Sequence, residues 1–329
     1  MAGMGRVKPP SDTFPPPPDA WVHGDPKGPP LVVIVGPTGA GKSGLAMGLA
    51  AENRGAIVSA DSRQVYEGFD IGTATPSADE LARVPHDLVS CVPPSQTYTV
   101  AAFQADARAA LSRRKAEGYL PMLVGGTGLY VRAVLDGLTI PPQAPDPALR
   151  EELAALANPW AALAEVDPET AARLHPNDRL RIVRALEVHR LTGSPISAQQ
   201  RTLPCPYRLM VIGVAAPRAD LYRRIDARVV AMREAGLLDE VQALAGRWGW
   251  DHPLLGTLGY AEMASYLRGE RSLPEATAAM AQHTRNYAKR QLTWFRADRR
   301  IRWLVRQPGE PDEQLVETAS RWLRAWALA

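Results

Sequence analysis

The stretch that decides the fold is Leu31–Ser43, which reads LVVIVGPTGAGKS. Its first five residues are all apolar, as is typical of a strand buried in a parallel sheet. Three glycines then allow a tight backbone bend, and the following SGLAMGLAAE has helical character. The spacing G-x-x-x-x-G-K-[ST] is met by Gly36, Gly41, Lys42 and Ser43. A strand, a glycine loop and a helix N-terminus in this order predict a phosphate-binding loop.

The composition is that of an ordinary soluble protein, with 329 residues, 46% of them hydrophobic and 22% charged. The formal charge of +3 and the pI of 8.9 are only mildly basic, so any nucleic-acid surface must come from local clustering. Cys91 and Cys205 stand alone, which excludes a disulfide framework or a C-x-x-C zinc site. No apolar run reaches the roughly 18 residues of a membrane span, so we expect a cytoplasmic protein.

The order of patterns along the chain predicts an α/β fold. Residues 1–30 are rich in proline and poor in apolar residues, so we interpret them as a disordered leader. Strand patterns at 31–35, 56–60 and 120–124 alternate with helical patterns, and a short strand is expected at 87–91. A further core strand at 207–217 precedes a mostly helical region whose first helix is expected to have Asp220 as its N-cap. This indicates a P-loop NTPase-like parallel sheet with flanking helices, formed by residues 31–140 and 204–329.

Residues 141–203 differ because they have no strand pattern. Prolines at 159, 168 and 176 break this region into short helical segments. We therefore predict a small all-helical insertion domain. In the segment NDRLRIVRALEV, Leu180, Val183 and Leu186 are expected on the buried side of a helix that also carries arginines 179, 181 and 184.

Asp61 is the acid that the pattern places best for chemistry. It follows the second strand, at the carboxyl edge where α/β sheets bind ligands. A plain ATPase would carry a magnesium-binding Asp after the strand LPMLV, but Gly125, Gly126 and Thr127 stand there. A simple ATPase is therefore disfavoured.

Seven blocks occur in the order seen in tRNA dimethylallyltransferases, and the sequence resembles that family from about residue 31 to 305. They are GPTGAGKS, DSRQVY (61–66), GTATP, GGTGLYVRAVLDGL (125–138), NDRLRIVRALEV (177–188), LGY (258–260) and TRNYAKRQLTWFR (284–296). The resemblance implies transfer of a dimethylallyl group from dimethylallyl diphosphate to N6 of the adenosine just 3′ of the anticodon. It also implies Mg²⁺ as cofactor and the tRNA anticodon stem-loop as partner. Nothing in the sequence indicates a membrane or an obligate protein partner.

The residues fit this chemistry. An exocyclic adenine amine is a poor nucleophile, so a base must take its proton, and Asp61 can serve. The diphosphate gains charge as it leaves, and Lys42, the loop amides and a magnesium ion on Ser43 can stabilise that charge. The predicted diphosphate-binding residues are Gly36, Thr38, Gly39, Ala40, Gly41, Lys42 and Ser43.

The resemblance adds three further catalytic positions. Thr127 matches the threonine of the GGTGLY block, and its alternative role is that of a helix N-cap. The family places a diphosphate-binding arginine in the block that holds Arg224 and Arg228, one helical turn apart. The role of each arginine stays open at this point, since either can be a solvated charge on a helix face.

RNA contacts are expected where basic and aromatic residues interleave. Residues 285–306 hold eight basic residues against one acid, together with Tyr287, Trp294, Phe295 and Trp303. A charged helix face over core tryptophans is the alternative. We predict that the target base leaves the stack and enters a channel between the loop and the insertion. The predicted tRNA contacts are Asp61, Ser62, Arg63, Gln64, Thr127, Arg181, Arg184, Gly259, Tyr260, Arg285, Lys289, Arg290 and Gln291.

The sequence departs from the family at one phosphate contact, because Thr75 stands where lysine is common. It also has no cysteines for the zinc finger of larger relatives. Two other function classes stay open on the residues alone. They are a P-loop kinase for a small metabolite and a non-catalytic RNA-binding P-loop protein.

Overall fold

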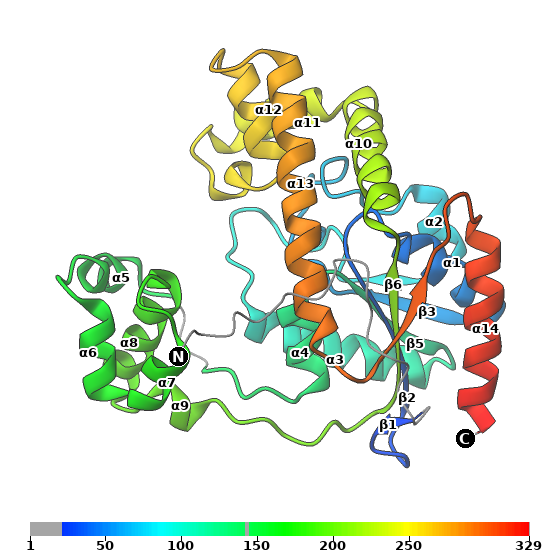
Figure 1. Ribbon diagram of the computed structural model, residues 1–329, viewed down its shortest axis with the longest axis horizontal. Helices are drawn as coiled ribbons and strands as arrows, with labels where there is room; N and C mark the ends of the chain where they lie inside the picture. The colour runs from blue at the N-terminus through cyan, green and yellow to red at the C-terminus, as the bar shows by residue number, and fades with distance from the viewer. Residues whose placement is uncertain (1–21, 142–144, 329) are drawn as a thin grey trace, which may run out of the picture. The chain divides into compact units, whose positions relative to one another are not determined.

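The computed structural model describes residues 22–141 and 145–328, which form two compact units (Figure 1). Unit 1 holds the chain up to Tyr98, then Asp106–Val131 and the chain from Pro206 onward. Unit 2 holds Thr99–Ala105 and Arg132–Cys205. The insertion expected at 141–203 lies inside Arg132–Cys205, but unit 2 begins earlier than expected, at Arg132, and also includes Thr99–Ala105.

Unit 1 is built on a mostly parallel sheet. In the described chain its strands are β1 (His23–Gly24), β2 (Pro30–Val35), β3 (Gly55–Ser59), β4 (His86–Asp87), β5 (Leu120–Gly125), β6 (Arg208–Ala215) and β7 (Ile301–Val305). Their spatial order is β1-β6-β2-β5-β3-β4, and β7 pairs with β6. Only β1 runs antiparallel to its neighbour. The predicted α/β fold with a parallel sheet and flanking helices is confirmed.

The middle of the sheet is fully buried, which explains its continuous apolar strands. Residues 31–35 of β2 have no exposed surface. Parallel strands covered by helices on both faces bury both sides, so they lack the alternation of a half-exposed strand. The helices of unit 1 include α1 (Lys42–Glu52), α2 (Ala78–Arg83), α10 (Arg218–Glu234), α11 (Leu237–Trp248), α12 (Tyr260–Leu267), α13 (Leu273–Arg296) and α14 (Asp312–Leu328). The helices α3 (Val100–Ala116) and α4 (Gly128–Leu135) each contribute residues to both units.

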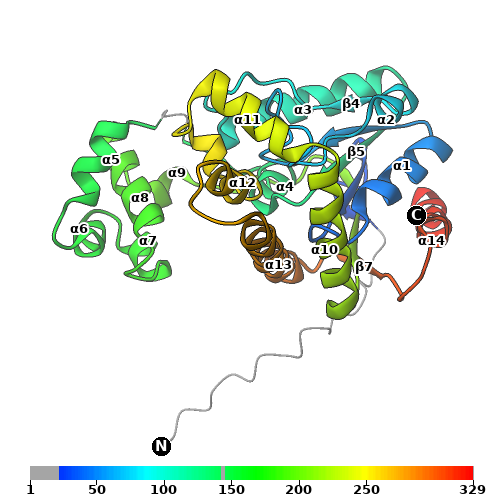
Figure 2. The same cartoon turned by 90° about the horizontal axis from the view of Figure 1, so that it is seen from above.

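The C-terminal helix α14 lies alongside α1, as both views show (Figures 1 and 2). Gly48 makes this approach close, since a Cβ there would lie 2.4 Å from Val316 Cγ2. The end of the chain therefore supports the helix that begins at the phosphate-binding loop.

Three expectations about element boundaries are wrong. Residues 22–30 are not part of a disordered leader, because His23 and Gly24 pair with Leu209 and Arg208; residues 1–21 lie outside the described residues. The strand expected at 87–91 ends at Asp87, where the backbone turns through positive φ at 88 and 90. Asp220 is not an N-cap: α10 begins two residues earlier, and Asp220 forms an ion pair with Arg223.

Unit 2 is helical in its described part. Its short helices are α5 (Pro147–Ala154), α6 (Pro159–Val166), α7 (Pro168–Arg173), α8 (Arg179–Thr192) and α9 (Ile196–Gln199). Prolines 159 and 168 begin helices, with Asn158 and Asp167 as N-caps. Leu180 is 89% exposed, contrary to expectation, because α8 enters the core of unit 2 only from Ile182 onward. Val183 and Leu186 are buried as predicted.

Candidate active site

The glycine loop has the conformation that a phosphate cradle requires. Gly36, Gly39 and Gly41 all have positive φ, and a Cβ on Gly36 would lie 2.2 Å from the carbonyl oxygen of Val214. The loop ends at Gly41, the N-cap of α1. A cavity of about 670 Å³ within unit 1 opens above it. Thr38, Lys42 and Ser43 of the predicted phosphate-binding set line this cavity, whereas the glycines and Ala40 shape the loop behind them.

Lys42 reaches the cavity but is bound back to the loop. Its Nζ donates a hydrogen bond of 2.8 Å to the carbonyl oxygen of Pro37. Burial, and then repulsion from Arg228, lower its pKa to about 8, although Asp61 acts in the opposite direction. Lys42 is therefore partly neutral at mildly alkaline pH while no anion is present.

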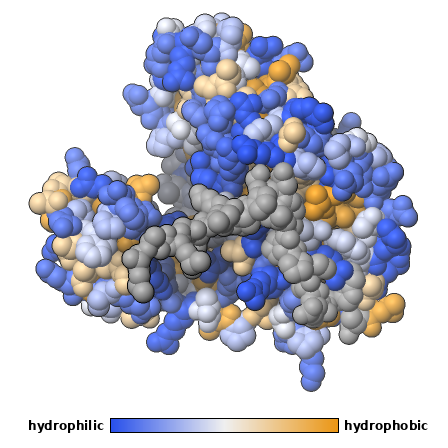
Figure 3. Space-filling view, viewed as in Figure 1, coloured by the Kyte–Doolittle hydropathy of each residue, from blue (hydrophilic) through white to orange (hydrophobic). Residues whose placement is uncertain are grey.

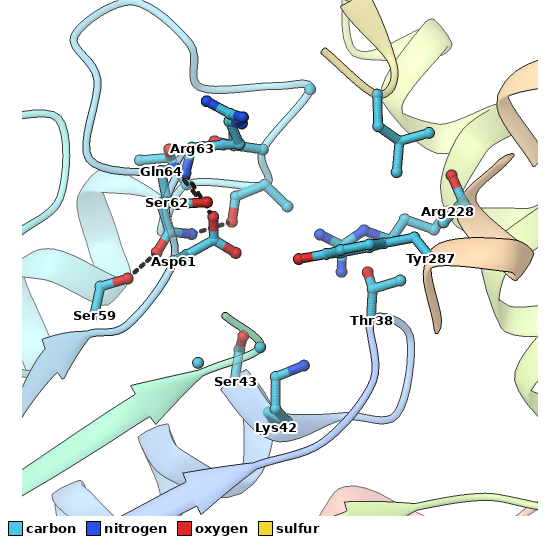
Figure 4. A pocket seen from close by; sticks show the side chains of 18 of the residues that line it. Thr38, Lys42, Ser43, Ser59, Asp61, Ser62, Arg63, Gln64, Arg228 and Tyr287 are labelled. Atoms are coloured by element: carbon cyan, nitrogen blue, oxygen red, sulfur yellow. Dashed lines mark hydrogen bonds between the residues drawn. The ribbon is translucent and has the colours of Figure 1, made fainter. Parts of the chain in front are cut away.

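Asp61 is held by its own turn, with its carboxylate toward the cavity (Figure 4). Its Oδ1 accepts hydrogen bonds from the backbone N–H groups of Arg63 at 2.8 Å and Gln64 at 3.3 Å. In the described chain Oδ2 has no hydrogen-bond partner. Ser59 Oγ donates to Gln64 Oε1 at 2.8 Å, which ties the turn to the end of β3. One carboxylate oxygen thus fixes the orientation and the other is left for chemistry.

Thr127 stands behind Asp61 rather than on the cavity wall. Its Oγ1 accepts a hydrogen bond of 3.1 Å from the backbone N–H of Ser62, and its own N–H donates to Ala60. Thr127 therefore joins the turn after β5 to the turn that carries Asp61.

Gln291 connects the phosphate-binding loop to the glycine turn after β5. Its Oε1 accepts from the N–H of Thr38, and its Nε2 donates to the carbonyl oxygen of Gly126, both at 2.9 Å. A Cβ on Gly126 would lie 2.2 Å from that Nε2, so the turn needs glycine there. Gln291 is 6% exposed and both ends of its amide are used within the protein. Gln291 thus has a structural role, and its expected contact with RNA stays a prediction.

The structure separates the two arginines of α10. Arg224 Nε donates to the carbonyl oxygen of Gly39 at 2.8 Å and does not line the cavity. Arg228 lines the cavity beside Tyr287 (Figure 4). Burial lowers the pKa of Arg228, and the charge of Asp61 opposes this effect. Of the two, Arg228 is the one available to an anion in the cavity.

Tyr287 of α13 points its hydroxyl toward Asp61 across the cavity (Figure 4). Burial, followed by the charge of Asp61, raises its pKa, although a hydrogen bond with Thr127 lowers it. The guanidinium of Arg290 lies 5.6 Å from the centre of its ring. The sequence showed Tyr287 only as one of several aromatic residues; its spacing of four from Gln291 was the available signal that both face inward.

The loop Asp70–Pro76 forms another wall, and one carboxylate fixes it. Glu240 of α11 accepts hydrogen bonds from the N–H groups of Asp70, Ile71 and Gly72 at 3.1, 2.7 and 3.1 Å. It also accepts one of 2.6 Å from the hydroxyl of Tyr260. No motif pointed to Glu240, because its partners are backbone groups about 170 residues away.

The family comparison fits this geometry. A match to the family described as IPP transferase covers residues 64–298, and a match to isopentenyl transferase covers residues 29–86. The chain belongs to the IPP transferase family.

Curated relatives align with nearly the whole length of this chain. It is 47% identical over 295 residues to the tRNA dimethylallyltransferase of Thermosynechococcus vestitus, spanning 89% of this chain and 94% of the relative. It is 46% identical to that of Gloeobacter violaceus, spanning 89% and 98%. The crystal structure of a full-length tRNA isopentenylpyrophosphate transferase from Bacillus halodurans matches with 39% identity and a TM-score of 0.67, covering 91% of this chain and 98% of that one.

The residues of unit 1 that are expected to contact RNA differ in where they lie. Arg63, Arg290 and Ser62 line the cavity, and Lys289 is exposed on α13. Arg285 is paired with Asp226. The face of α10 to α13 that is visible in Figure 3 is predominantly hydrophilic.

The LGY block lies at the wall of the site. Tyr260 lines the cavity, is 1% exposed, and its hydroxyl donates to Glu240. The N–H of Gly259 donates to Glu262 at 2.7 Å. These contacts hold the two residues in place, and their contact with RNA stays a prediction.

In unit 2 the two predicted arginines also differ. Arg181 is exposed at the start of α8 and pairs with Asp178. Arg184 pairs at 2.6 Å with the fully buried Glu187, which Arg150 and the N–H of Asp146 also contact. Arg184 therefore belongs to the core contacts of unit 2.

The described residues were also compared with the requirements of a metal site and of a membrane-spanning helix. Among the described residues no group of three or more His, Cys, Asp and Glu is arranged to hold a metal ion. Within the same part of the chain, no helix combines the length and the apolar character needed to cross a bilayer.

Proposed function

We propose that this protein transfers the dimethylallyl group of dimethylallyl diphosphate to N6 of the adenosine just 3′ of the anticodon of tRNA. The single observation that supports this most is that Asp61 faces Lys42 and Arg228 across one cavity. A candidate base and a candidate anion-binding site thus line the same cavity. The names of relatives that are 46–47% identical support the same activity.

Asp61 acts as the base. The amine lone pair forms the new C–N bond to the allylic carbon, and one amine proton passes to Oδ2 of Asp61. The other carboxylate oxygen keeps its hydrogen bonds to the turn, so the base stays oriented during the transfer. Tyr287 limits the space around this base in the cavity, and Thr127 supports the turn that carries the base.

Lys42, Arg228 and the loop amides hold the diphosphate. The allylic C–O bond breaks as the C–N bond forms, and its electron pair leaves on the diphosphate. Fixed positive groups near that oxygen stabilise the developing charge. Ser43 would hold a magnesium ion, since its exposed hydroxyl lines the cavity and Mg²⁺ commonly takes few protein ligands beside substrate phosphates and water. When bound, the ion would supply further charge neutralisation to the diphosphate.

An apolar wall suits the five-carbon group. Ile225, Val229 and Met280 line the same cavity and carry no polar side-chain atom except the thioether. A hydrocarbon chain loses contact with water against such a wall, which contributes about 25 cal/mol per Å² of buried surface.

We propose that tRNA is bound by both units in the cytoplasm. Arg290 and Lys289 of α13 and Arg179 and Arg181 at the start of α8 supply exposed positive charge. Residues 141–203 thereby act as a tRNA-contacting insertion. Such phosphate contacts make the affinity fall steeply with salt.

The test is incubation of the protein with dimethylallyl diphosphate, Mg²⁺ and a tRNA that has adenosine after its anticodon, followed by mass spectrometry of the digested tRNA. We expect a dimethylallylated adenosine, and none from a tRNA with another base at that position. Binding of tRNA without any product would contradict the proposal and favour a non-catalytic RNA-binding protein. Consumption of ATP on a small metabolite, with no RNA present, would favour a kinase.

A further inference from the structure

The carboxylate of Glu240 is saturated with hydrogen bonds although it lies outside the catalytic centre. Three consecutive backbone N–H groups and one tyrosine hydroxyl converge on its two oxygens. Hydrogen bonds to an ionised acceptor are about twice as strong as those between neutral groups. One side chain from α11 therefore holds all three backbone N–H groups of the segment 70–72.

The aromatic packing around this carboxylate admits little movement. The ring of Tyr260 lies 4.8 Å from that of Phe69, centre to centre. A Cβ on Gly72 would lie 2.5 Å from Tyr260 Cζ, so the loop lies directly on the ring. Burial, and then Glu240, raise the pKa of Tyr260, which keeps its hydroxyl protonated as a donor.

Two hydrogen-bonded routes lead from this loop to Gln64. In the first, the side chain Nε2 of Gln64 donates to the carbonyl oxygen of Ala74 at 3.0 Å. In the second, Ser90 Oγ donates to Asp70 Oδ1 at 2.8 Å, while the N–H of Ser90 donates to the carbonyl oxygen of Gln64 at 2.9 Å. Gln64 is thus held by its side chain and by its backbone.

Gln64 in turn orients the base. Its N–H is one of the two backbone groups bound to Oδ1 of Asp61 (Figure 4). A shift of the loop would therefore be passed to the carboxylate that takes the proton. A displacement of about 1 Å at a reacting group can cost on the order of 100-fold in rate.

We propose that Glu240 is a positioning residue for the transfer step, acting through the loop Asp70–Thr75 and Gln64 on the carboxylate of Asp61. This role rests on the proposed function, since it assumes that Asp61 is the base. The loop has the uncharged Thr75 where the family commonly has a lysine at a phosphate contact. We propose that Lys42 and Arg228, which lie on other elements, hold the diphosphate, so Glu240 is expected to affect turnover and not donor binding.

The test compares Glu240→Gln with Asp239→Asn, an exposed neighbour on α11 that also loses one negative charge. In Glu240→Gln, an amide group replaces one acceptor oxygen and faces N–H or O–H donors. We expect kcat to fall roughly 10–100-fold with an unchanged KM for the donor, and Asp239→Asn to behave as the wild type. Gln64→Ala combined with Glu240→Gln should cost less than the product of the two single effects. Unchanged kcat in Glu240→Gln, or multiplicative effects in the double variant, would overturn the proposal.

Hydrogen exchange supplies a readout that does not depend on activity. Glu240→Gln should accelerate amide exchange in Asp70–Gly72 and also at Arg63 and Gln64, without a matching change in the central strands. Faster exchange in 70–72 alone would overturn the link to Asp61. If the wild type makes no product, the proposed function fails, while this exchange experiment still decides the link. Should Glu240→Gln not fold, Tyr260→Phe removes one of the four hydrogen bonds and is expected to shift both readouts in the same direction.

Discussion

The carbonyl oxygen of Gly39 accepts a hydrogen bond of 2.8 Å from Nε of Arg224, so this arginine is committed to the back of the phosphate-binding loop. Arg228, one helical turn later, lines the cavity. The two residues have the same side chain on the same helix, yet of the two only Arg228 lines the cavity in which we propose that the donor binds.

Arg228→Met should therefore raise the KM for dimethylallyl diphosphate roughly 10–100-fold, the equivalent of losing one charge-assisted hydrogen bond of about 1.5–3 kcal/mol. Arg224→Met should leave that KM nearly unchanged and lower the free energy of unfolding by about 0.5–1.5 kcal/mol. Steady-state kinetics and denaturant unfolding of both variants measure this. Equal KM values in the two variants would refute the proposal that Arg228, and not Arg224, binds the diphosphate.

Diphosphate binding should be coupled to protonation of Lys42. The pKa of Lys42 is lowered to about 8, so near that pH about half of the molecules carry a neutral amine. A bound anion restores the charge, so wild-type protein should take up roughly 0.5 proton more than Lys42→Arg, whose guanidinium stays protonated. Calorimetry in two buffers of different ionisation enthalpy gives this number. Affinity should weaken as the pH rises above 8; identical proton uptake in Lys42→Arg would contradict the prediction.

Gln291→Leu should disconnect the loop from the glycine turn. The N–H of Thr38 and the carbonyl of Gly126 lose their partner, at a cost of about 1–3 kcal/mol for each group left buried. We expect a lower free energy of unfolding and a lower kcat/KM. Gln282→Leu, on an exposed turn of the same helix, is the matched control and should change stability little. A variant at 291 as stable as this control would exclude the bridging role.

Unit 2 should open more readily in acid because of Glu187. Burial alone would raise its pKa, but hydrogen bonds from Arg150 and Arg184 outweigh burial and hold the pKa below 4.5. The stabilisation is therefore complete above pH 4.5 and is lost as the pH falls through the pKa of the folded state. Glu187→Gln should remove this pH dependence and cost about 1.5–3 kcal/mol at neutral pH. Hydrogen exchange of unit 2 peptides from pH 7 to 4, measured in the wild type and in Glu187→Gln, tests the pH dependence and the loss of stability. Parallel pH profiles in the two proteins would argue against the role of Glu187.

The local signals in the sequence predicted the parts of the site that are local in the structure. The strand, loop and helix from Leu31 onward depend on neighbouring residues, and Asp61 follows directly from the end of its strand. The position of Gln291 could not be predicted from the sequence, because a basic and aromatic helix segment has the same pattern whether its glutamine faces solvent or a glycine turn. Its burial depends on a partner 253 residues earlier.

The same limit explains the missed residues. Glu240 has only backbone groups and one hydroxyl as partners, so no side-chain motif marks it. Leu180 follows the helical spacing of buried residues, but the core of unit 2 takes in this helix only from Ile182 onward. His23 and Gly24 form a strand too short for any periodicity, held only by pairing with β6.

The bond between Thr38 and Gln291 also sets an order of events during synthesis of the chain. Translation adds about 5–20 residues per second, so on the order of tens of seconds separate the emergence of the two residues. During that interval the glycine loop lacks the side chain that fixes one of its N–H groups. A ribosome that stops before α13 therefore releases a chain with the complete loop motif but without a finished donor site, and such a product should neither bind diphosphate tightly nor compete for donor in the cell.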